Sequence, residues 1–215
     1  MLVHNTLRTL LFVLSFGLVA TAQGAGIMKG DAAAGEGKAV TCSACHGADG
    51  NSAVSTFPKL AGLGEKYLLK QMKDIRDGRR PVAVMAGQVD NMTDQDLADI
   101  AAFYDAQERT SEMADEELVD LGRKVYMSGI MDRKVAACSG CHSPSGKGNG
   151  PAGFPGLAGQ HADYIAAQLQ MFRTGYESPE GRTNDGDSKI MRTTAFELSD
   201  LEIKAVASYA SGLRQ

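Results

Sequence analysis

The sequence is poor in the large side chains that usually fill a protein interior. It contains no tryptophan, and aromatic residues make up only 6% of its 215 residues. A chain of this length can form one large or two small domains, and each domain must bury an apolar core. Because aromatic residues are so few, we expect a group other than side chains to help fill those cores.

A basic surface and a long apolar run are missing as well. The chain has 22 basic and 26 acidic residues, a formal net charge of −4, and neither half is basic. This balance argues against nucleic acid as a partner, because nucleic-acid-binding proteins concentrate positive charge. The apolar run at residues 10–20 is too short to span a membrane, which takes about 20 residues.

The N-terminal segment has the pattern of a secretory signal peptide. Arg8 precedes the apolar run 10–20, and small residues follow at the two positions that a signal peptidase reads. We expect cleavage after Ala22, so that residues 1–22 are removed, with Ala25 as the alternative site. An uncleaved membrane anchor would need a longer apolar stretch. The mature protein is therefore predicted to be exported to the periplasm.

An internal repeat divides the rest of the chain. The matching segments are 42–46 with 138–142, 57–62 with 154–159 and, after about nine extra residues in the second copy, Met85 with Met191 and Thr93 with Ser199. The repeat predicts two homologous domains, at residues 23–109 and 110–215.

Helical periodicity recurs in both copies, and no segment alternates as a strand would. Thr93 and Ser199 are each followed three residues later by an acid, which predicts a capping box and a helix start in each half. The other expected helices cover residues 32–40, 65–77, 116–127 and 162–174. The predicted fold class is all-α.

The repeated pentapeptide Cys-x-x-Cys-His carries the chemistry. Its two thiols can form thioethers to the two vinyl groups of a haem, and the adjacent histidine then reaches the iron. Both copies are intact and together use every cysteine of the chain. The sequence therefore predicts two c-type haems, attached at Cys42, Cys45, Cys138 and Cys141 with His46 and His142 as iron ligands.

Three other uses of these cysteines are found in exported proteins, and the sequence disfavours each of them. Disulfides would explain the cysteines but not the two histidines, and a thioredoxin-like redox pair would need a sheet. A zinc ribbon would need its two cysteine pairs much closer than Cys45 and Cys138 lie in the chain. The haem motif explains all six residues.

The repeat also selects the second axial ligands. Met85 and Met191 each lie eight residues before a capping-box hydroxyl, so they occupy the same point of the two copies. Met72 and Met92 are matched by leucines and are expected to be core residues. Methionine is a common second ligand of c-type haem iron, so we expect Met85 and Met191 to complete the iron coordination.

Two further features remain open from the residues alone. His161 is the one histidine of the mature chain outside a haem motif, and it could replace Met191, begin a helix or contact a haem propionate. The carbonyl groups near Pro58 and Pro155 could accept a hydrogen bond from the ring of His46 or His142 and fix its tautomer.

Several longer segments resemble those of the cytochrome c4 family. They are CSACHGADGNS, FPKLAG, GEKYLLKQMKDIRDG and TDQDLADIAAFY in the first half, and CSGCH, GFPGLAGQH and RTNDGDSKIMR in the second. The resemblance implies two tandem class I cytochrome c domains related by pseudo-twofold symmetry, with the haems facing each other. It implies the same cysteine, histidine and methionine ligands. One departure is a short loop at residues 78–84, before Met85.

The resemblance further implies an electron carrier and not an enzyme. Its expected role is to pass electrons in a respiratory chain from a quinol-oxidising cytochrome complex or another donor to a terminal oxidase, with peripheral membrane association as an open point. A related alternative is the dihaem cytochrome subunit of a flavocytochrome sulfide dehydrogenase. A dihaem peroxidase would need one iron without methionine, which the two matched methionines disfavour.

Overall fold

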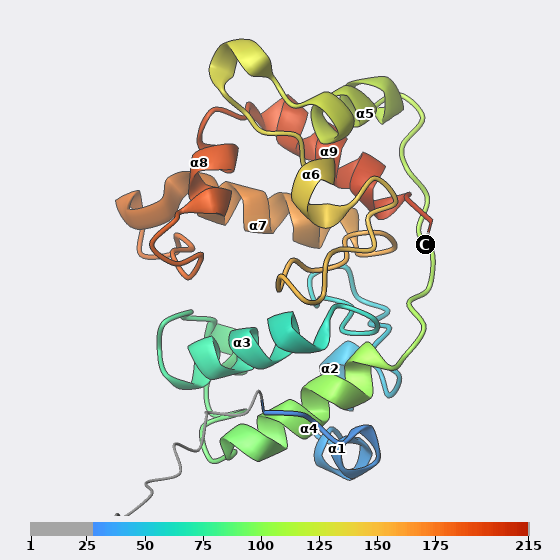
Figure 1. The fold of residues 1–215 in the computed structure, drawn as a ribbon, viewed down its shortest axis with the longest axis vertical. Coiled ribbons are helices and arrows are strands. Elements are labelled where there is room, and N and C mark those ends of the chain that lie inside the picture. The colour runs from blue at the N-terminus through green and yellow to red at the C-terminus, as the bar shows by residue number, and fades with distance from the viewer. Residues whose placement is uncertain (1–27, 215) are drawn as a thin grey trace, which may run out of the picture.

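The computed structural model describes residues 28–214, and helices dominate it (Figure 1). The elements are α1 (Ala32–Lys38), α2 (Ser43–His46), α3 (Glu65–Arg76), η1 (Ala83–Met85), α4 (Asp94–Asp105), α5 (Val119–Ser128), η2 (Met131–Arg133), α6 (Ser139–His142), α7 (Ala162–Thr174), η3 (Gly175–Glu177), α8 (Ile190–Phe196) and α9 (Asp200–Ser211). Within these residues β-structure is limited to two isolated bridges. The predicted all-α class is confirmed.

The elements form two helical units that follow one another along the chain. Helices α1 to α4 lie together, α5 to α9 lie together, and residues 106–118 connect the two units along one side (Figure 1). The predicted domain boundary between residues 109 and 110 falls within this connection and remains a prediction. Among the α-helices of the second unit that are longer than a single turn, α8 is the one that the sequence did not predict.

Each unit is closed by a tight crossing of its first and last long helices. A Cβ atom built on Gly35 of α1 would lie 2.0 Å from the carbonyl oxygen of Asp99 in α4. In the second unit, a Cβ on Gly122 of α5 would lie 2.2 Å from the carbonyl oxygen of Ala205 in α9. Only glycine permits such an approach of two helix backbones. The crossing is therefore a shared feature of both units.

Both predicted capping boxes are present. The Thr93 hydroxyl accepts from the Asp96 amide while the Asp96 carboxylate accepts from the Thr93 amide, and Ser199 and Glu202 repeat this arrangement at the start of α9. Such reciprocal bonds satisfy amide groups that the first helical turn leaves unpaired. These bonds fix the starts of α4 and α9, the last helix of each unit.

The two cores differ in size. In the first unit the buried apolar cluster consists of Ala39, Leu63, Leu68, Ile100, Ala101 and Tyr104. In the second it consists of Val125, Tyr126, Val135, Ile165, Leu169, Phe172, Ala195, Leu198, Ile203, Val206, Ala207 and Ala210. The second cluster is the larger of the two, and it includes Ala195 of α8.

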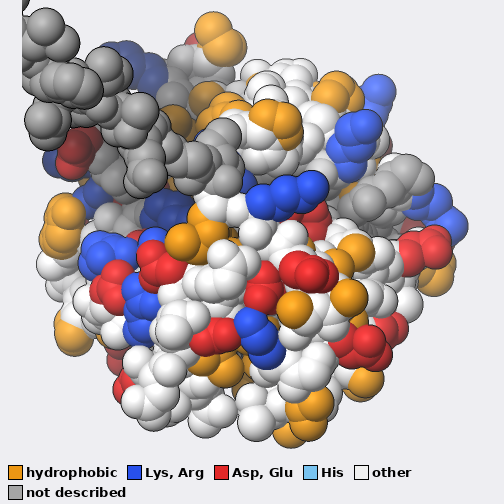
Figure 2. All heavy atoms as spheres, turned by 60° about the horizontal axis from the view of Figure 1, so that its bottom comes forward, with side chains coloured by type: hydrophobic (Ala, Val, Ile, Leu, Met, Phe, Trp, Pro, Cys, Tyr) orange, Lys and Arg blue, Asp and Glu red, His pale blue; other side chains and the backbone are white. Residues whose placement is uncertain are grey.

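The outer face of the first unit carries charges of both signs, which lie interspersed in Figure 2. Several of them pair: Lys38 with Asp96 and Asp99, at 2.7 and 2.6 Å, and Lys73 with Asp94 at 2.6 Å.

Within the part of the chain that the structure describes, no helix is both long and apolar enough to cross a membrane. The predicted signal peptide, residues 1–22, lies outside the described residues.

Candidate functional site

The two Cys-x-x-Cys-His motifs each form a single helical turn. Cys42 directly precedes α2 and Cys45 lies within it, while Cys138 and Cys141 take the same places at α6. Residues three apart on a helix point to the same side, so each turn presents both of its thiols together. All four thiols are free. Burial raises the pKa of the Cys138 thiol to about 11.

The two motif histidines are buried and held in the same way. The ring Nδ1 of His46 donates to the Pro58 carbonyl at 2.9 Å, and that of His142 donates to the Pro155 carbonyl at 2.9 Å. Burial lowers the pKa of both imidazoles, although the carbonyl bonds oppose this shift. The predicted role of the two proline segments is confirmed. A neutral ring with its proton on Nδ1 leaves the Nε2 lone pair free for a metal.

The two matched methionines occupy the segments that follow α3 and α7. Met85 ends the short turn η1, and Met191 is the second residue of α8; both side chains are partly buried. Met72 and Met92 instead pack against the core of the first unit, as predicted for them. The assignment of Met85 and Met191 as iron ligands remains a prediction.

His161 has a different role from the motif histidines. It precedes α7, its Nε2 lies 2.9 Å from the Ser52 carbonyl oxygen, and its Nδ1 lies 3.2 Å from a carboxylate oxygen of Glu112. Both ring nitrogens are thus occupied by protein groups of the first half and the connection. His161 directly precedes a helix, and its ring takes part in the contact between the two units.

The alternatives to haem find no support among residues 28–214. The four cysteines form no disulfide there, no sheet of the thioredoxin kind is present, and no three side chains of the metal-binding types come together. By contrast, each motif offers paired thiols on one helical turn beside a neutral imidazole with a free nitrogen. These residues fit covalently attached haem in both units.

The alignment of the two repeats did not identify one pair of buried side chains between the units. These are Arg80 and Arg182, which we call the interface arginines. The Arg80 amide donates to the carbonyl of Asp74 at 2.8 Å, and the Arg182 amide donates to the carbonyl of Met171 at 2.8 Å. Asp74 and Met171 are matched by the repeat, so the two arginines are structural equivalents. Their separation of 102 positions falls between the two offsets of the repeat, 97 and 106, which concealed them.

A second set of contacts joins the units beside the motif loops. The Gln160 side chain accepts from the amide of Lys59 and donates to its carbonyl, at 2.9 and 2.7 Å. Arg109 donates to the carbonyl oxygens of Ala61, Gly156 and Ala158 at 2.6 to 3.1 Å. These bonds tie the loops after both haem motifs to each other and to the connection.

Comparison with known proteins identifies relatives over nearly the whole chain. The family model for cytochrome c matches residues 29–106 and again residues 119–213. Cytochrome c4 of Pseudomonas aeruginosa is 53% identical over 201 residues, covering 94% of this chain and 96% of the relative. The crystal structure of reduced recombinant cytochrome c4 from Pseudomonas stutzeri is 49% identical with a TM-score of 0.82, and the match covers 86% of this chain and all of that one.

A second kind of relative is more distant. A protein named thiosulfate dehydrogenase electron acceptor, from Stutzerimonas stutzeri (strain A1501), is 35% identical over 181 residues. The match covers 82% of this chain and 81% of the relative.

Proposed function

The chain belongs to the cytochrome c4 family of dihaem electron carriers, and we propose that it carries electrons in the periplasm between a quinol-oxidising complex or another donor and a terminal oxidase. The observation that supports this best is the matched pair of motif histidines, each with Nδ1 bound to a proline carbonyl at 2.9 Å. The same arrangement in both units suits two haems of the same kind. This similarity favours an electron relay through two like centres over a protein with a single catalytic centre.

The proposed haem contacts follow the repeat. Cys42 and Cys45 attach the haem of the first unit and Cys138 and Cys141 that of the second, while His46 and Met85, and His142 and Met191, bind the two irons. The free thiols on single helical turns support the attachment. The equivalent positions of the two methionines after α3 and α7 support the ligation.

Haem c supplies a one-electron ferric/ferrous couple when it is bound. The protein's part is to hold that couple in one coordination state. Pro58 and Pro155 fix the proton of each imidazole on Nδ1 and keep Nε2 oriented as a ligand. Met85 and Met191 would each supply the second protein ligand of a haem iron, so that no position would be left for oxygen or peroxide. A soft thioether ligand would favour the ferrous state and so raise the reduction potential.

A spectroscopic experiment tests the sites. The denatured protein should retain two covalently bound haems per chain in alkaline pyridine. Met85→Ala and Met191→Ala should each remove about half of the near-infrared band of the iron-thioether bond, because each removes one of two such bonds. Met92→Ala is the matched control and should leave the band intact. One haem per chain, or a band insensitive to Met85→Ala, would contradict the assignment.

A kinetic experiment tests the partners. A purified quinol-oxidising complex supplied with quinol should reduce the protein, and a terminal oxidase should then oxidise it, at rates that fall as salt screens the encounter. Failure of both reactions, in a protein that holds two haems, would refute the respiratory role and leave the haem sites standing.

A second function is favoured by one relative. Because the thiosulfate dehydrogenase electron acceptor aligns over 82% of this chain, the chain could take electrons from a thiosulfate-oxidising enzyme. Adding such an enzyme with thiosulfate should then reduce this protein faster than quinol and the quinol-oxidising complex do. The reverse order of rates would favour the respiratory role.

A further inference from the structure

The ring of His161 lies between two groups that can only accept hydrogen bonds. Its Nε2 lies 2.9 Å from the carbonyl oxygen of Ser52, and its Nδ1 lies 3.2 Å from a carboxylate oxygen of Glu112. A carbonyl and an ionised carboxylate have no proton to donate. A neutral imidazole has one N–H group and satisfies one of the two oxygens, whereas an imidazolium satisfies both. The geometry therefore favours a second proton on this ring.

The charges around the ring oppose one another. Glu112 attracts a proton to His161, but it is also bound at 2.6 Å by the ammonium group of Lys59 from the first unit. On the ring's own side, the N-terminus of α7 carries a partial positive charge and its first turn contains the acidic Asp163. The guanidinium of Arg109, in the connection, binds only backbone carbonyl oxygens. Because these charges nearly balance, a further charge nearby can decide whether the ring is protonated.

Protons can reach the ring from the solvent. The side chain of Lys59 is 3% exposed and that of His161 is 11% exposed, but that of Glu112 is 34% exposed. The carboxylate of Glu112 thus contacts both the buried ring and the solvent. A carboxylate in this position can pass a proton between the two.

The site is attached to the backbone that orients the first motif histidine. The Pro58 carbonyl accepts from Nδ1 of His46, and Lys59 is the next residue in the chain. Gln160, which directly precedes His161, accepts from the Lys59 amide at 2.9 Å and donates to the Lys59 carbonyl at 2.7 Å. Both the ring and its charged neighbours are therefore held beside the peptide that contacts His46.

The second unit has no equivalent of this site. The repeat matches Lys59 with Gly156 and His161 with Gly64. The Gly156 carbonyl accepts instead from Arg109 at 2.9 Å. Burial lowers the pKa of Arg109 to about 10, so this residue keeps its charge near neutral pH. A change of protonation at His161 should therefore act mainly on the first unit.

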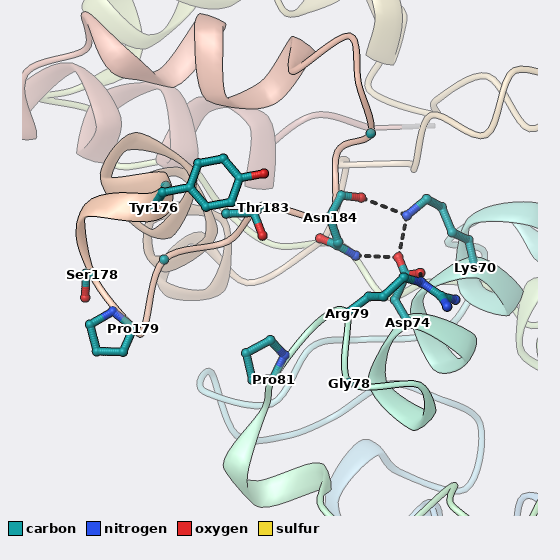
Figure 3. Close-up of a pocket in the computed structure, with 13 residues that line it drawn as sticks. Lys70, Asp74, Gly78, Arg79, Pro81, Tyr176, Ser178, Pro179, Thr183 and Asn184 are labelled. Carbon is teal, nitrogen blue, oxygen red and sulfur yellow. Dashed lines mark hydrogen bonds and ion pairs between the residues drawn. The ribbon is translucent and has the colours of Figure 1, made fainter.

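The charges at the open cleft between the units behave differently from those around His161. The cleft has a volume of about 740 Å³, and its lining includes Lys70, Asp74, Arg79 and Asn184 (Figure 3). Burial alone would raise the pKa of Asp74, but hydrogen bonds from these three neighbours lower it. This carboxylate therefore stays ionised near neutral pH. Neither His161 nor its charged partners line the cleft.

We propose that His161 and Glu112 form a proton-binding site coupled to the first haem, so that reduction at His46 is accompanied by uptake of a proton. The inference rests on the proposed function, since it needs a haem held by His46. Reduction brings one electron from the donor and makes the first haem site more negative by one charge. His161 then takes one proton from the solvent by way of Glu112, and an N–H bond forms at Nδ1. On oxidation the electron leaves, and that bond breaks as the proton returns to the solvent.

The coupling has a definite sign. The added electron favours the protonated ring, so His161 holds its proton to higher pH in the reduced protein than in the oxidised one. Between these two limits a rise in pH removes the proton and favours oxidation. The reduction potential of the first haem should therefore fall as the pH rises through the range of histidine, about pH 5 to about pH 8. The potential of the second haem should change less.

The experiment uses the mature protein with both haems attached. Redox titrations at a series of pH values are followed through the haem methyl resonances in the proton NMR spectrum, which separate the two haems. The resonances that change in Met85→Ala identify the first haem. His161→Gln, which has no group that titrates in this range, should abolish the fall in the first potential. Glu116→Gln is the matched control, because it removes the same charge as Glu112→Gln at an exposed position of the connection.

Two further variants should move the fall in opposite directions. Glu112→Gln removes the carboxylate that attracts the proton, so the fall should occur at lower pH. Lys59→Gln removes the cation that competes for this carboxylate, so the fall should occur at higher pH. Shifts in the same direction, or no shift in either variant, would overturn the proposal. These variants also decide the question if His161→Gln does not accumulate.

The ring itself provides a measurement that does not depend on the potentials. His161 is the one histidine of the mature chain outside a haem motif, so its ring nitrogen resonances should be the only ones to titrate in the reduced protein. Nδ1 should gain its proton over the pH range in which the first potential changes. A ring that keeps Nδ1 unprotonated throughout this range would refute the proton site.

The remaining outcomes separate this inference from the function on which it rests. A first potential that is independent of pH, or a fall that His161→Gln leaves unaltered, would overturn the coupling. An equal fall in both potentials would contradict the assignment to the first haem. A protein with fewer than two haems would refute the proposed function instead, and the titration of the His161 ring would still test the proton site.

Discussion

The two units share their histidine geometry but support their methionines differently. The distance from the ring Nδ1 to the proline carbonyl is 2.9 Å in both. Met85, however, lies on η1, a turn without a buried residue. Met191 lies on α8, which buries Ala195, and its side chain packs against the second core.

This contrast shows which parts of a duplicated site diverge easily. The cysteine and histidine side depends on a single helical turn and a proline carbonyl 12 or 13 positions away. The methionine side depends on a loop, and loops tolerate insertion. The second copy has about nine extra residues before α8, and there Met191 packs against the second core, whereas Met85 lies on a turn without a buried residue.

The largest effect is expected where the units are most alike. Gly35→Val and Gly122→Val should each destabilise their own unit by about 3 kcal/mol, because the new side chain overlaps a helix backbone. Thermal unfolding followed at the haem absorbance measures this. Gly37→Ala is the control, since a Cβ there meets nothing within 4 Å. Equal stability of Gly35→Val and the control would refute the close crossing.

A smaller effect is expected from a variant that removes the structural support of Met191 and so makes the two methionines more alike. Arg192 of α8 pairs with Asp185 at 2.7 Å, and its guanidinium lies 4.6 Å from the ring centre of Tyr176. Arg192→Gln leaves the Asp185 carboxylate without its partner and should weaken this segment by about 2 kcal/mol. The near-infrared band in a Met85→Ala background should then disappear at lower temperature. An unchanged transition would show that α8 does not support Met191.

The contrast should also appear in the thermal stability of the two iron–methionine bonds. Since η1 lacks buried residues, the Met85 bond should be lost before the Met191 bond on heating, with a difference on the order of 1 kcal/mol, about fivefold in equilibrium constant. Comparing the near-infrared band in Met191→Ala, which reports Met85, with that in Met85→Ala separates the two. Simultaneous loss would mean that the interface and not the local turn determines their stability.

The smallest effect concerns acid. Lys38 lies 2.6 Å from Asp99 and lowers the pKa of that carboxyl to about 2, helped by the Asp31 amide and by Gln95. The unfolded pKa is about 3.9, so this stabilisation is complete above that value and is lost as the pH falls through about 2. The matched position in α9 is Ala205. Acid should therefore destabilise the crossing of α1 and α4 in the first unit more than the crossing of α5 and α9 in the second.

Asp99→Asn supplies the test of this last difference. Urea unfolding of the Met191→Ala variant, whose remaining near-infrared band reports the first unit, should shift to lower urea between about pH 4 and about pH 2. In Asp99→Asn that part of the shift should be absent. Equal pH dependence with and without Asp99 would assign the acid sensitivity to other carboxylates.

The sequence predicted correctly those features that depend on contacts between residues close together in the chain. The helix at residues 162–174 was predicted with the bounds that the structure has, and the carbonyl partners of His46 and His142 were expected from the position of Pro58 and Pro155. It failed for α8, because residues 190–196 match residues 84–90 of the first half, where only the short turn η1 forms. It also left the partner of His161 open, since Ser52 lies 109 positions away.

The sequence by itself determined the duplicated all-α fold, the two Cys-x-x-Cys-His turns and the capping boxes, because each of these depends on hydrogen bonds or covalent chemistry within a few residues. The tertiary structure alone decided that Arg80 and Arg182 are equivalents, that His161 joins the units and that Gln160 binds Lys59 across them. These side chains find their partners through the packing of one unit on the other. No periodicity or spacing in the chain encodes that packing, because it depends on surfaces that exist only after both units have folded.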